Sequence, residues 1–145
     1  MQIAAQNRKA RYNYFFIEVF EAGIQLMGSE IKSLRDGRVD ISESFAREVN
    51  NEIFLINSYF SKYASSSYMN HDESRPRKLL LHKKEIQKIS GKIKKESLTL
   101  IPTKIYFNKK GIAKLEIALS KGKKLHDKRE VKKKRSWERE KKTIR

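Results

Sequence analysis

The stretch TLIPTKIYFNKKGIAKLEIAL, residues 99–119, decides the fold class. Two series of alternating residues run through it: Thr99, Ile101, Thr103, Ile105 and Phe107, then Ala113, Leu115, Ile117 and Leu119. A period of two is typical of β-strands that bury one face. Between the series, Lys109-Lys110-Gly111 is typical of a turn. The stretch therefore predicts an antiparallel hairpin.

Two more hairpins are predicted nearer the N-terminus. In the first, residues 14–20 form a strand with Phe15, Ile17 and Val19 on one face, residues 21–23 turn, and residues 24–27 return. In the second, the strands cover residues 45–49 and 52–56, joined by a turn at Asn50-Asn51. The three hairpins together predict six short strands.

Helices are predicted in two places. Residues 29–36 begin with a serine, space Ile31 and Leu34 by three and stop at Gly37. A second helix is predicted from Pro76 to about Lys94, with a stripe formed by Leu79, Ile86, Ile89 and Ile93. Its Leu79-Leu80-Leu81 run is more apolar than one helix face requires, so at least one of the three leucines is expected to contact something besides the main core. Residues 57–74 are predicted to be a long loop, with His71-Asp72-Glu73 in solvent.

Six antiparallel strands in a domain of this size form either a sandwich or a small closed barrel. A basic barrel that carries Tyr and Phe favours the oligonucleotide-binding type. We therefore expect a mainly β chain: a six-stranded antiparallel OB-like barrel with about three short helices and a basic C-terminal tail.

Charge points to a polyanionic partner. The chain has a net charge of +17, and residues 120–145 hold 13 Lys and Arg against 4 Asp and Glu. Their few apolar residues cannot offset the entropy of ordering this segment, so we expect it to be disordered when free and helical when bound. Nucleic acid is the first candidate. We divide the chain into a barrel domain, 1–119, and a basic tail, 120–145.

Other classes of function are poorly supported by the sequence. The chain contains no cysteine, which suits a reducing cytoplasm and excludes Cys-ligated metals, and its N-terminus lacks the apolar segment of a signal peptide. No apolar run approaches the roughly 20 residues that span a bilayer. His71, His82 and His126 have no spacing that brings them together. We expect no catalytic residue, no metal and no cofactor. Basic residues around Pro76, namely Arg75, Arg77 and Lys78, are either solubility charge or phosphate contacts.

Five blocks of sequence resemble one family. They are Asn7-Arg8-Lys9-Ala10-Arg11, Phe20-Glu21-Ala22-Gly23-Ile24, residues 28–35 (GSEIKSLR), residues 77–83 (RKLLLHK) and residues 121–129 (KGKKLHDKR). In this order they closely resemble the SmpB family, the SsrA-binding proteins of bacteria, over about residues 7–140. The resemblance implies a six-stranded OB-like barrel and a role in trans-translation. Such a protein binds the tRNA-like domain of transfer-messenger RNA and delivers it to stalled 70S ribosomes.

The resemblance also implies site residues. For the tRNA-like domain these are Asn7, Arg8, Lys9, Arg11, Glu21, Lys32, Arg35, Leu80 and Lys114. For the decoding centre, where small-subunit ribosomal RNA lies, and for the mRNA channel they are Lys121, Lys123, Lys124, His126, Asp127, Lys128, Arg129, Lys133, Lys134, Arg135 and Trp137. A monomer that contacts no membrane is implied.

Two other functions stay open. One is a general single-strand or ribosomal RNA-binding barrel with a promiscuous tail, which a preference for folded tRNA-like RNA over a homopolymer would exclude. The other is a nuclease or other RNA-processing enzyme, which would need clustered carboxylates or histidines that the sequence pattern does not bring together.

Overall fold

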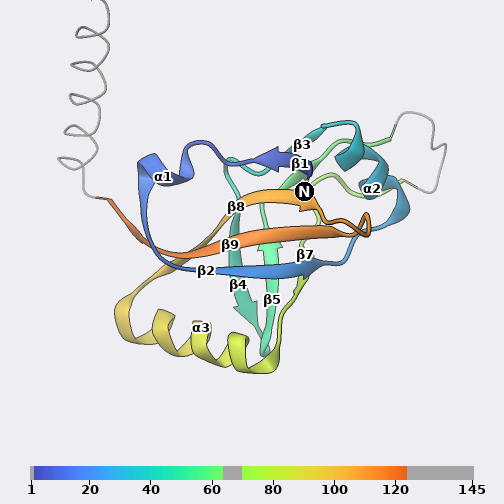
Figure 1. Ribbon diagram of the computed structural model, residues 1–145. Helices are drawn as coiled ribbons and strands as arrows, with labels where there is room; N and C mark the ends of the chain where they lie inside the picture. The colour runs from blue at the N-terminus through green and yellow to red at the C-terminus, as the bar shows by residue number, and fades with distance from the viewer. Residues whose placement is uncertain (1, 64–69, 124–145) are drawn as a thin grey trace, which may run out of the picture.

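The structure is a computed structural model that describes residues 2–63 and 70–123. Its elements, labelled in Figure 1, are β1 (Gln2–Gln6), α1 (Ala10–Asn13), β2 (Tyr14–Ile24), α2 (Gly28–Arg35), β3 (Val39–Asp40), β4 (Phe45–Val49), β5 (Glu52–Ile56), β6 (Tyr59–Phe60), β7 (Arg77–Leu80), α3 (Lys83–Glu96), β8 (Thr99–Phe107) and β9 (Ala113–Gly122). The fold is therefore mainly β, as predicted.

Within the described residues, six strands close a ring. Hydrogen-bonded neighbours follow the order β8-β4-β5-β7-β2-β9, and β9 pairs back with β8. Every pairing is antiparallel, β1 adds to β8 outside the ring, and β3 pairs with β6 in a separate small sheet. A ring of six antiparallel strands is consistent with the expected OB-like fold.

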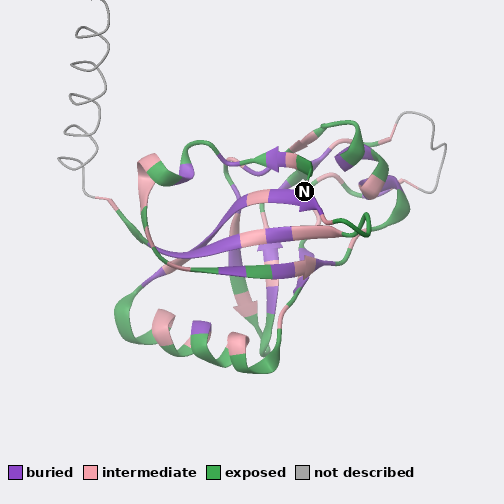
Figure 2. Ribbon diagram, in the orientation of Figure 1, coloured by how far each residue is buried: buried purple, intermediate pink, exposed green. Residues whose placement is uncertain are grey.

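The core fills the ring, and α3 lies across one of its ends (Figures 1 and 2). Ile89 of α3 is buried in the core, and Ile86 and Ile93 pack against it, which confirms these three positions of the predicted stripe. On β2, Glu18 accepts hydrogen bonds from Lys88 at 2.5 Å and Lys92 at 3.0 Å. These bonds lower the pKa of Glu18 and tie the polar side of α3 to the barrel.

The hairpin of β8 and β9 is confirmed, with Gly111 at a φ of +75° in its turn. Leu115, Ile117 and Leu119 of β9 are fully buried in the core. The single alternating face predicted for β8 is wrong, because the register shifts between Pro102 and Lys104. This β-bulge reverses the phase, so Leu100 faces the core before it, and Ile105 and Phe107 face the core after it.

The predicted hairpin at residues 14–27 is wrong. Residues 21–23 do not turn, because β2 continues to Ile24 and pairs with β9 from Tyr14 opposite Gly122 to Gly23 opposite Lys114. A turn would forfeit these ladder bonds. A bulge shifts the register between Phe16 and Glu18, but Phe15, Ile17 and Val19 are all about half exposed and alternate with less exposed residues, as the predicted common face requires.

The segment from Pro76 to Lys94 is a strand followed by a helix, not one helix. Leu79 pairs with Ile24 of β2 and with Ile53 of β5, so β7 joins the two halves of the ring. Because side chains alternate along a strand, Leu79 is buried and Leu80 is 47% exposed. Leu80 is therefore the leucine of the run that is available for the contact outside the core, and that contact stays a prediction.

The second hairpin and the first helix are confirmed as β4–β5 and α2. Asn50 and Asn51 have the positive φ values, 51° and 64°, of a tight hairpin turn, and Gly37 follows α2 at a φ of +72°. The predicted loop at 57–74 contains β6, and residues 64–69 of it lie outside the described residues.

His71 is not in solvent. Its ring is buried between Ser29 Oγ and the Phe60 carbonyl oxygen, each at 2.8 Å from a ring nitrogen. The side chain therefore joins α2 to β6, a role that the polar residues around it in the sequence did not suggest.

A buried ion network joins α2 to β7. Glu30 and Arg77 are both 0% exposed, with Arg77 Nε 2.6 Å from Glu30 Oε2, and Arg75 hydrogen-bonds to the same carboxylate. Arg77 also donates to the carbonyl oxygens of Asp72 and Glu73. Arg77 is therefore neither a solubility charge nor a phosphate contact, the two roles expected for it.

Candidate nucleic-acid interface

One row of paired residues crosses the outer face of the barrel. Leu80 of β7 lies opposite Gly23 of β2, Gly23 opposite Lys114 of β9, and Lys114 opposite Tyr106 of β8. Directly paired residues of antiparallel strands project from the same face of a sheet. The row thus places the exposed Leu80 on one side of Gly23 and Lys114 on the other side.

A cleft of about 640 Å³ opens over this row. Its lining includes Glu21, Leu80 and Lys114, three residues from distant parts of the chain that the family resemblance indicates as RNA contacts. Glu21 lies two residues before Gly23 on β2 and so projects from the same face. The structure brings these three together on one surface.

Gly23 lets β2 and β7 approach closely beneath the cleft. A Cβ atom at this position would lie 3.2 Å from Leu80 Cβ, tighter than an ordinary van der Waals contact. Gly23 does not serve a turn, as the sequence suggested; it leaves room for Leu80. The leucine therefore packs its base against the glycine while about half of its surface remains exposed.

Tyr106 fixes the carboxylate of Glu21. The tyrosine hydroxyl donates a hydrogen bond to Glu21 Oε2 across the intervening strand β9, and Tyr106 is only 6% exposed. Burial, followed by the hydrogen bond and negative charge of Glu21, raises the pKa of Tyr106 well above its ordinary value. The tyrosine therefore stays a donor at neutral pH and leaves Glu21 Oε1 free to accept. Sequence reasoning missed Tyr106, because only the register of β8, β9 and β2 reveals the contact.

Lys114 has no counter-ion within residues 2–63 and 70–123, whereas its neighbour Lys104 lies 3.9 Å from Glu116. An ammonium group that no carboxylate neutralises is available for a phosphate of a bound polyanion. Lys114 is therefore the strongest candidate for a phosphate contact in this cleft.

The N-terminal site residues lie apart from the cleft and differ among themselves. Arg8, Lys9 and Arg11 are exposed, and the Arg11 guanidinium lies 5.0 Å from the centre of the Phe16 ring. Asn7 is buried, and its side-chain nitrogen donates to the Pro102 carbonyl oxygen at 3.1 Å. Asn7 is thus placed to anchor the basic turn that follows it rather than to present its own side chain.

Lys32 and Arg35 project from α2 and do not line the cleft over Gly23. Lys32 Nζ lies 5.1 Å from the centre of the Tyr63 ring, and the Arg35 guanidinium lies 5.8 Å from that of Phe107. Both cations are therefore held against aromatic rings on another side of the molecule.

Only the first two residues assigned to the ribosome fall within the described chain. Lys121 belongs to β9, which ends at Gly122 rather than at the predicted Leu119, and Lys123 donates from its amide to the Asn13 carbonyl oxygen at 2.9 Å. The others lie outside the described residues: Lys124, His126, Asp127, Lys128, Arg129, Lys133, Lys134, Arg135 and Trp137.

In the part of the chain that the structure describes, no three His, Cys, Asp or Glu side chains are grouped so that they could hold a metal ion. The described helices include none that is both long and apolar enough to cross a membrane.

Comparisons with known proteins place the chain in a family. The family model described as SmpB protein matches residues 4–145. The SsrA-binding protein of Afipia carboxidovorans is 55% identical over 141 residues, which cover 97% of this chain and 90% of the relative. The SsrA-binding protein of Allorhizobium ampelinum is 55% identical over 140 residues, which cover 97% of this chain and 89% of the relative.

A solved structure described as "tmRNA-SmpB: a journey to the center of the bacterial ribosome" contains a similar chain, with a TM-score of 0.69 and 50% sequence identity. The match covers 83% of this chain and 84% of that one. Sequence blocks, barrel topology and these matches agree, and the chain belongs to the SmpB protein family.

Proposed function

We propose that this protein is the RNA-binding adaptor of trans-translation. It binds the tRNA-like domain of transfer-messenger RNA and delivers that RNA to stalled ribosomes, where its basic tail senses the empty mRNA channel. One observation carries the proposal: Glu21, Leu80 and Lys114, distant in sequence, line a single exposed cleft on a chain of net charge +17.

Each cleft residue suits a different part of an RNA. Lys114 neutralises a phosphate, because its ammonium group has no carboxylate partner in the described chain. Leu80 packs against a base or sugar, since half of its surface is exposed. Glu21 accepts hydrogen bonds from base amino groups or 2′-hydroxyls, the group that distinguishes RNA from DNA. Such a combination favours a specific folded RNA over a uniform polyanion.

The same proposal covers the division of the chain, its ribosomal partner, its location and its oligomeric state. Residues 1–123 form the RNA-binding body and residues 124–145 the tail, which binds small-subunit ribosomal RNA near the decoding centre of the 70S ribosome. The protein acts as a cytoplasmic monomer, without a cofactor and without catalysing a reaction.

Replacing Leu80 with alanine should weaken binding to the tRNA-like RNA at least fivefold, a loss of about 1 kcal/mol. The exposed leucine contributes little to the core, so the free energy of unfolding should change by only about 0.5 kcal/mol. Lys114→Ala should also weaken binding and flatten the log–log salt slope by up to about one unit. Gel-shift titrations at several salt concentrations and thermal melts measure these effects.

Val49, an exposed apolar residue outside the lining of the cleft, offers the matched control. Val49→Ala should leave RNA affinity unchanged. A sharp fall in melting temperature for Leu80→Ala, with normal RNA affinity, would show that Leu80 serves the core. Equal affinity of the wild type for a homopolymer of the same length would favour the general RNA-binding barrel.

Tyr106→Phe should lower RNA affinity several-fold, because it frees the Glu21 carboxylate from its fixed orientation. The effect should disappear in a Glu21→Ala background and persist in a Lys114→Ala background, since only Glu21 shares the hydrogen bond. A double-mutant cycle on the dissociation constants measures this coupling. Equal losses in both backgrounds would mean that Tyr106 acts on RNA binding without Glu21.

A further inference from the structure

Lys123 ties the end of β9 to α1 and β2 by three contacts, which together form the Lys123 clamp. Its backbone amide donates to the Asn13 carbonyl oxygen at 2.9 Å, and its ammonium group donates to the Arg11 carbonyl oxygen at 2.8 Å. The same ammonium nitrogen lies 4.8 Å from the centre of the Phe15 ring. We infer that Lys123 is a positioning residue, which fixes the direction in which residues 124–145 leave the barrel. The inference rests on the proposed function and adds to it a residue that acts inside the protein.

The two carbonyl oxygens of the clamp belong to the C-terminal end of α1, a helix of only four residues. The last carbonyl groups of a helix have no partner within it, and a lysine near the helix end can supply one. A helix this short is not stable by itself, so other elements must hold it. Lys123 does so from a position 112 residues beyond Arg11. The end of β9 and α1, which lie side by side in Figure 1, are therefore joined as one unit.

Phe15 provides the surface on which the lysine side chain rests. The backbone of Phe15 is held opposite Lys121 in the β2–β9 ladder, and its ring is about half exposed. An ammonium group over an aromatic ring is attracted by the π-electrons of that ring. One such contact and one hydrogen bond together shift a conformational equilibrium by about tenfold. The clamp therefore favours one path of the chain just after the ladder ends, where Tyr14 lies opposite Gly122.

The clamp lies between two parts of the proposed function. The exposed Arg8 and Lys9 stand directly before α1, and residues 124–145 follow directly after Lys123. The clamp thus holds the basic turn and the start of the tail in a fixed relation to each other. A segment that already points in its binding direction loses less freedom on binding, and its apparent affinity rises with the fraction of time spent in that direction.

The family resemblance implies a different role for Lys123, a direct contact with the ribosome. The geometry favours the internal role, because the ammonium group already has a carbonyl acceptor and an aromatic ring within the protein. By contrast, the side chain of Lys121 is exposed and has no partner in residues 2–63 and 70–123. The two roles differ in what they require of Phe15, which the clamp needs and a direct ribosomal contact of Lys123 does not.

Nuclear magnetic resonance of the free protein tests the clamp in the absence of a ribosome. The Phe15 ring should shift the ε-methylene protons of Lys123 upfield in the wild type, and Phe15→Leu should remove this shift. Lys123→Met and Phe15→Leu should each lower the heteronuclear NOE of the amide at position 123, because the chain there becomes more mobile. An unshifted Lys123 signal in the wild type would overturn the inference.

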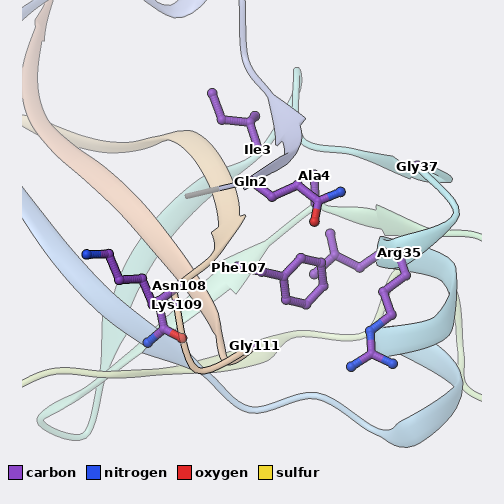
Figure 3. Close-up of a pocket in the computed structure, with 10 residues that line it drawn as sticks. Gln2, Ile3, Ala4, Arg35, Gly37, Phe107, Asn108, Lys109 and Gly111 are labelled. Carbon is purple, nitrogen blue, oxygen red and sulfur yellow. The ribbon is translucent and has the colours of Figure 1, made fainter.

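The matched control is Lys110, which lies between Lys109 and Gly111 in the β8–β9 turn that Figure 3 shows. It is exposed, and its side chain has no partner within the described chain. Lys110→Met removes the same charge as Lys123→Met from the opposite end of β9. It should change neither the signals of Lys123 nor the rate of tagging.

The tagging assay tests the consequence of the clamp. At limiting protein concentration, Lys123→Met should slow the tagging of stalled nascent chains about threefold or more, because the tail starts in the right direction for a smaller fraction of the time. Affinity for a transcript of the tRNA-like domain should change less than about twofold, and the melting temperature should stay close to that of the wild type. Lys123→Arg should restore most of the rate, because arginine also donates to a carbonyl group and stacks on an aromatic ring.

A double variant separates the clamp from a ribosomal contact. Phe15→Leu combined with Lys123→Met should tag no more slowly than Lys123→Met alone, since both changes remove the same contact. Losses that multiply, or normal tagging by Lys123→Met, would show the inference to be wrong while the proposed function stands. If the wild type neither prefers the transcript nor supports tagging, the proposed function fails, and the role given to Lys123 fails with it.

Discussion

Exchange of Glu30 for glutamine is expected to lower the free energy of unfolding by about 3–5 kcal/mol at neutral pH, because it leaves the buried Arg77 guanidinium without a counter-charge. Glutamine offers one neutral acceptor where the carboxylate accepts from Arg77, Arg75 and the Met27 amide. A loss of this size is a large part of the 5–15 kcal/mol that stabilises a typical domain. Urea denaturation followed by circular dichroism measures it.

The difference between the wild type and the Glu30→Gln variant should depend on pH. Burial by itself would raise the pKa of Glu30, but hydrogen bonds from Arg75 and Met27 and the charge of Arg77 hold it below its ordinary value of 4.5. A carboxyl with a lowered folded-state pKa contributes stability above its unfolded-state pKa and loses it as pH falls through the folded-state value. The difference in the free energy of unfolding between the wild type and Glu30→Gln should therefore be largest near pH 7. It should disappear in acid, as the pH falls below 4.5.

Glu52→Gln is the matched control, because Glu52 pairs with Lys78, the residue after Arg77, at 3.0 Å on the exposed surface. That change should cost less than about 1 kcal/mol. If Glu30→Gln is too unstable to purify, Arg75→Met removes the partner that is 29% exposed and should give a smaller, measurable loss. Equal stabilities of the Glu30 and Glu52 variants would contradict the structural role of the network.

Removal of residues 124–145 is expected to abolish the tagging of stalled nascent chains and to leave binding of the tRNA-like RNA largely intact. The cut is placed after Lys123, because β9 extends to Gly122 and the Lys123 amide is bonded to Asn13. It removes 11 Lys and Arg and 4 Asp and Glu, so non-specific RNA affinity should fall. The cleft over Gly23 remains whole, since its lining lies within residues 21–114.

The measurement pairs a gel-shift titration with an in-vitro tagging assay on ribosomes that carry a message without a stop codon. Trp137→Ala, or His126→Ala combined with Arg129→Ala, should impair tagging more than RNA binding. A variant with residues 124–145 in scrambled order keeps the charge and serves as the control. Normal tagging by the scrambled variant would reduce the tail to a source of positive charge, and loss of RNA binding by the truncated protein would place the main RNA site in the tail.

The sequence pattern predicted an element correctly where that element pairs or packs with residues close to it in the chain. The alternation at Leu115, Ile117 and Leu119, the Asn50-Asn51 turn and the helical spacing of Ile86, Ile89 and Ile93 each predicted what the structure contains. In these segments the hydrogen-bond partners or the buried face lie a few residues away, so periodicity and turn residues are enough to specify them.

Errors arose where a strand pairs with a distant partner. Glu21-Ala22-Gly23 has the composition of a turn, but its backbone pairs with residues 114–116 of β9. Leu79 fits a helical stripe with Ile86 and Ile89, but residues 77–80 complete the ring between β5 and β2. The β-bulge in β8 changed which residues face the core, and no local signal marked it.

By itself the sequence determined the basic character of the chain, its mainly β class, and a family resemblance that the comparisons bear out. Only the tertiary structure decided that Arg77 is a buried partner of Glu30, that Tyr106 holds Glu21, and that Leu80, Gly23 and Lys114 share one row. The physical reason is that charge and periodicity are properties of neighbouring residues. A site on a closed ring of strands depends instead on the register between segments that are about 60–90 residues apart in the chain.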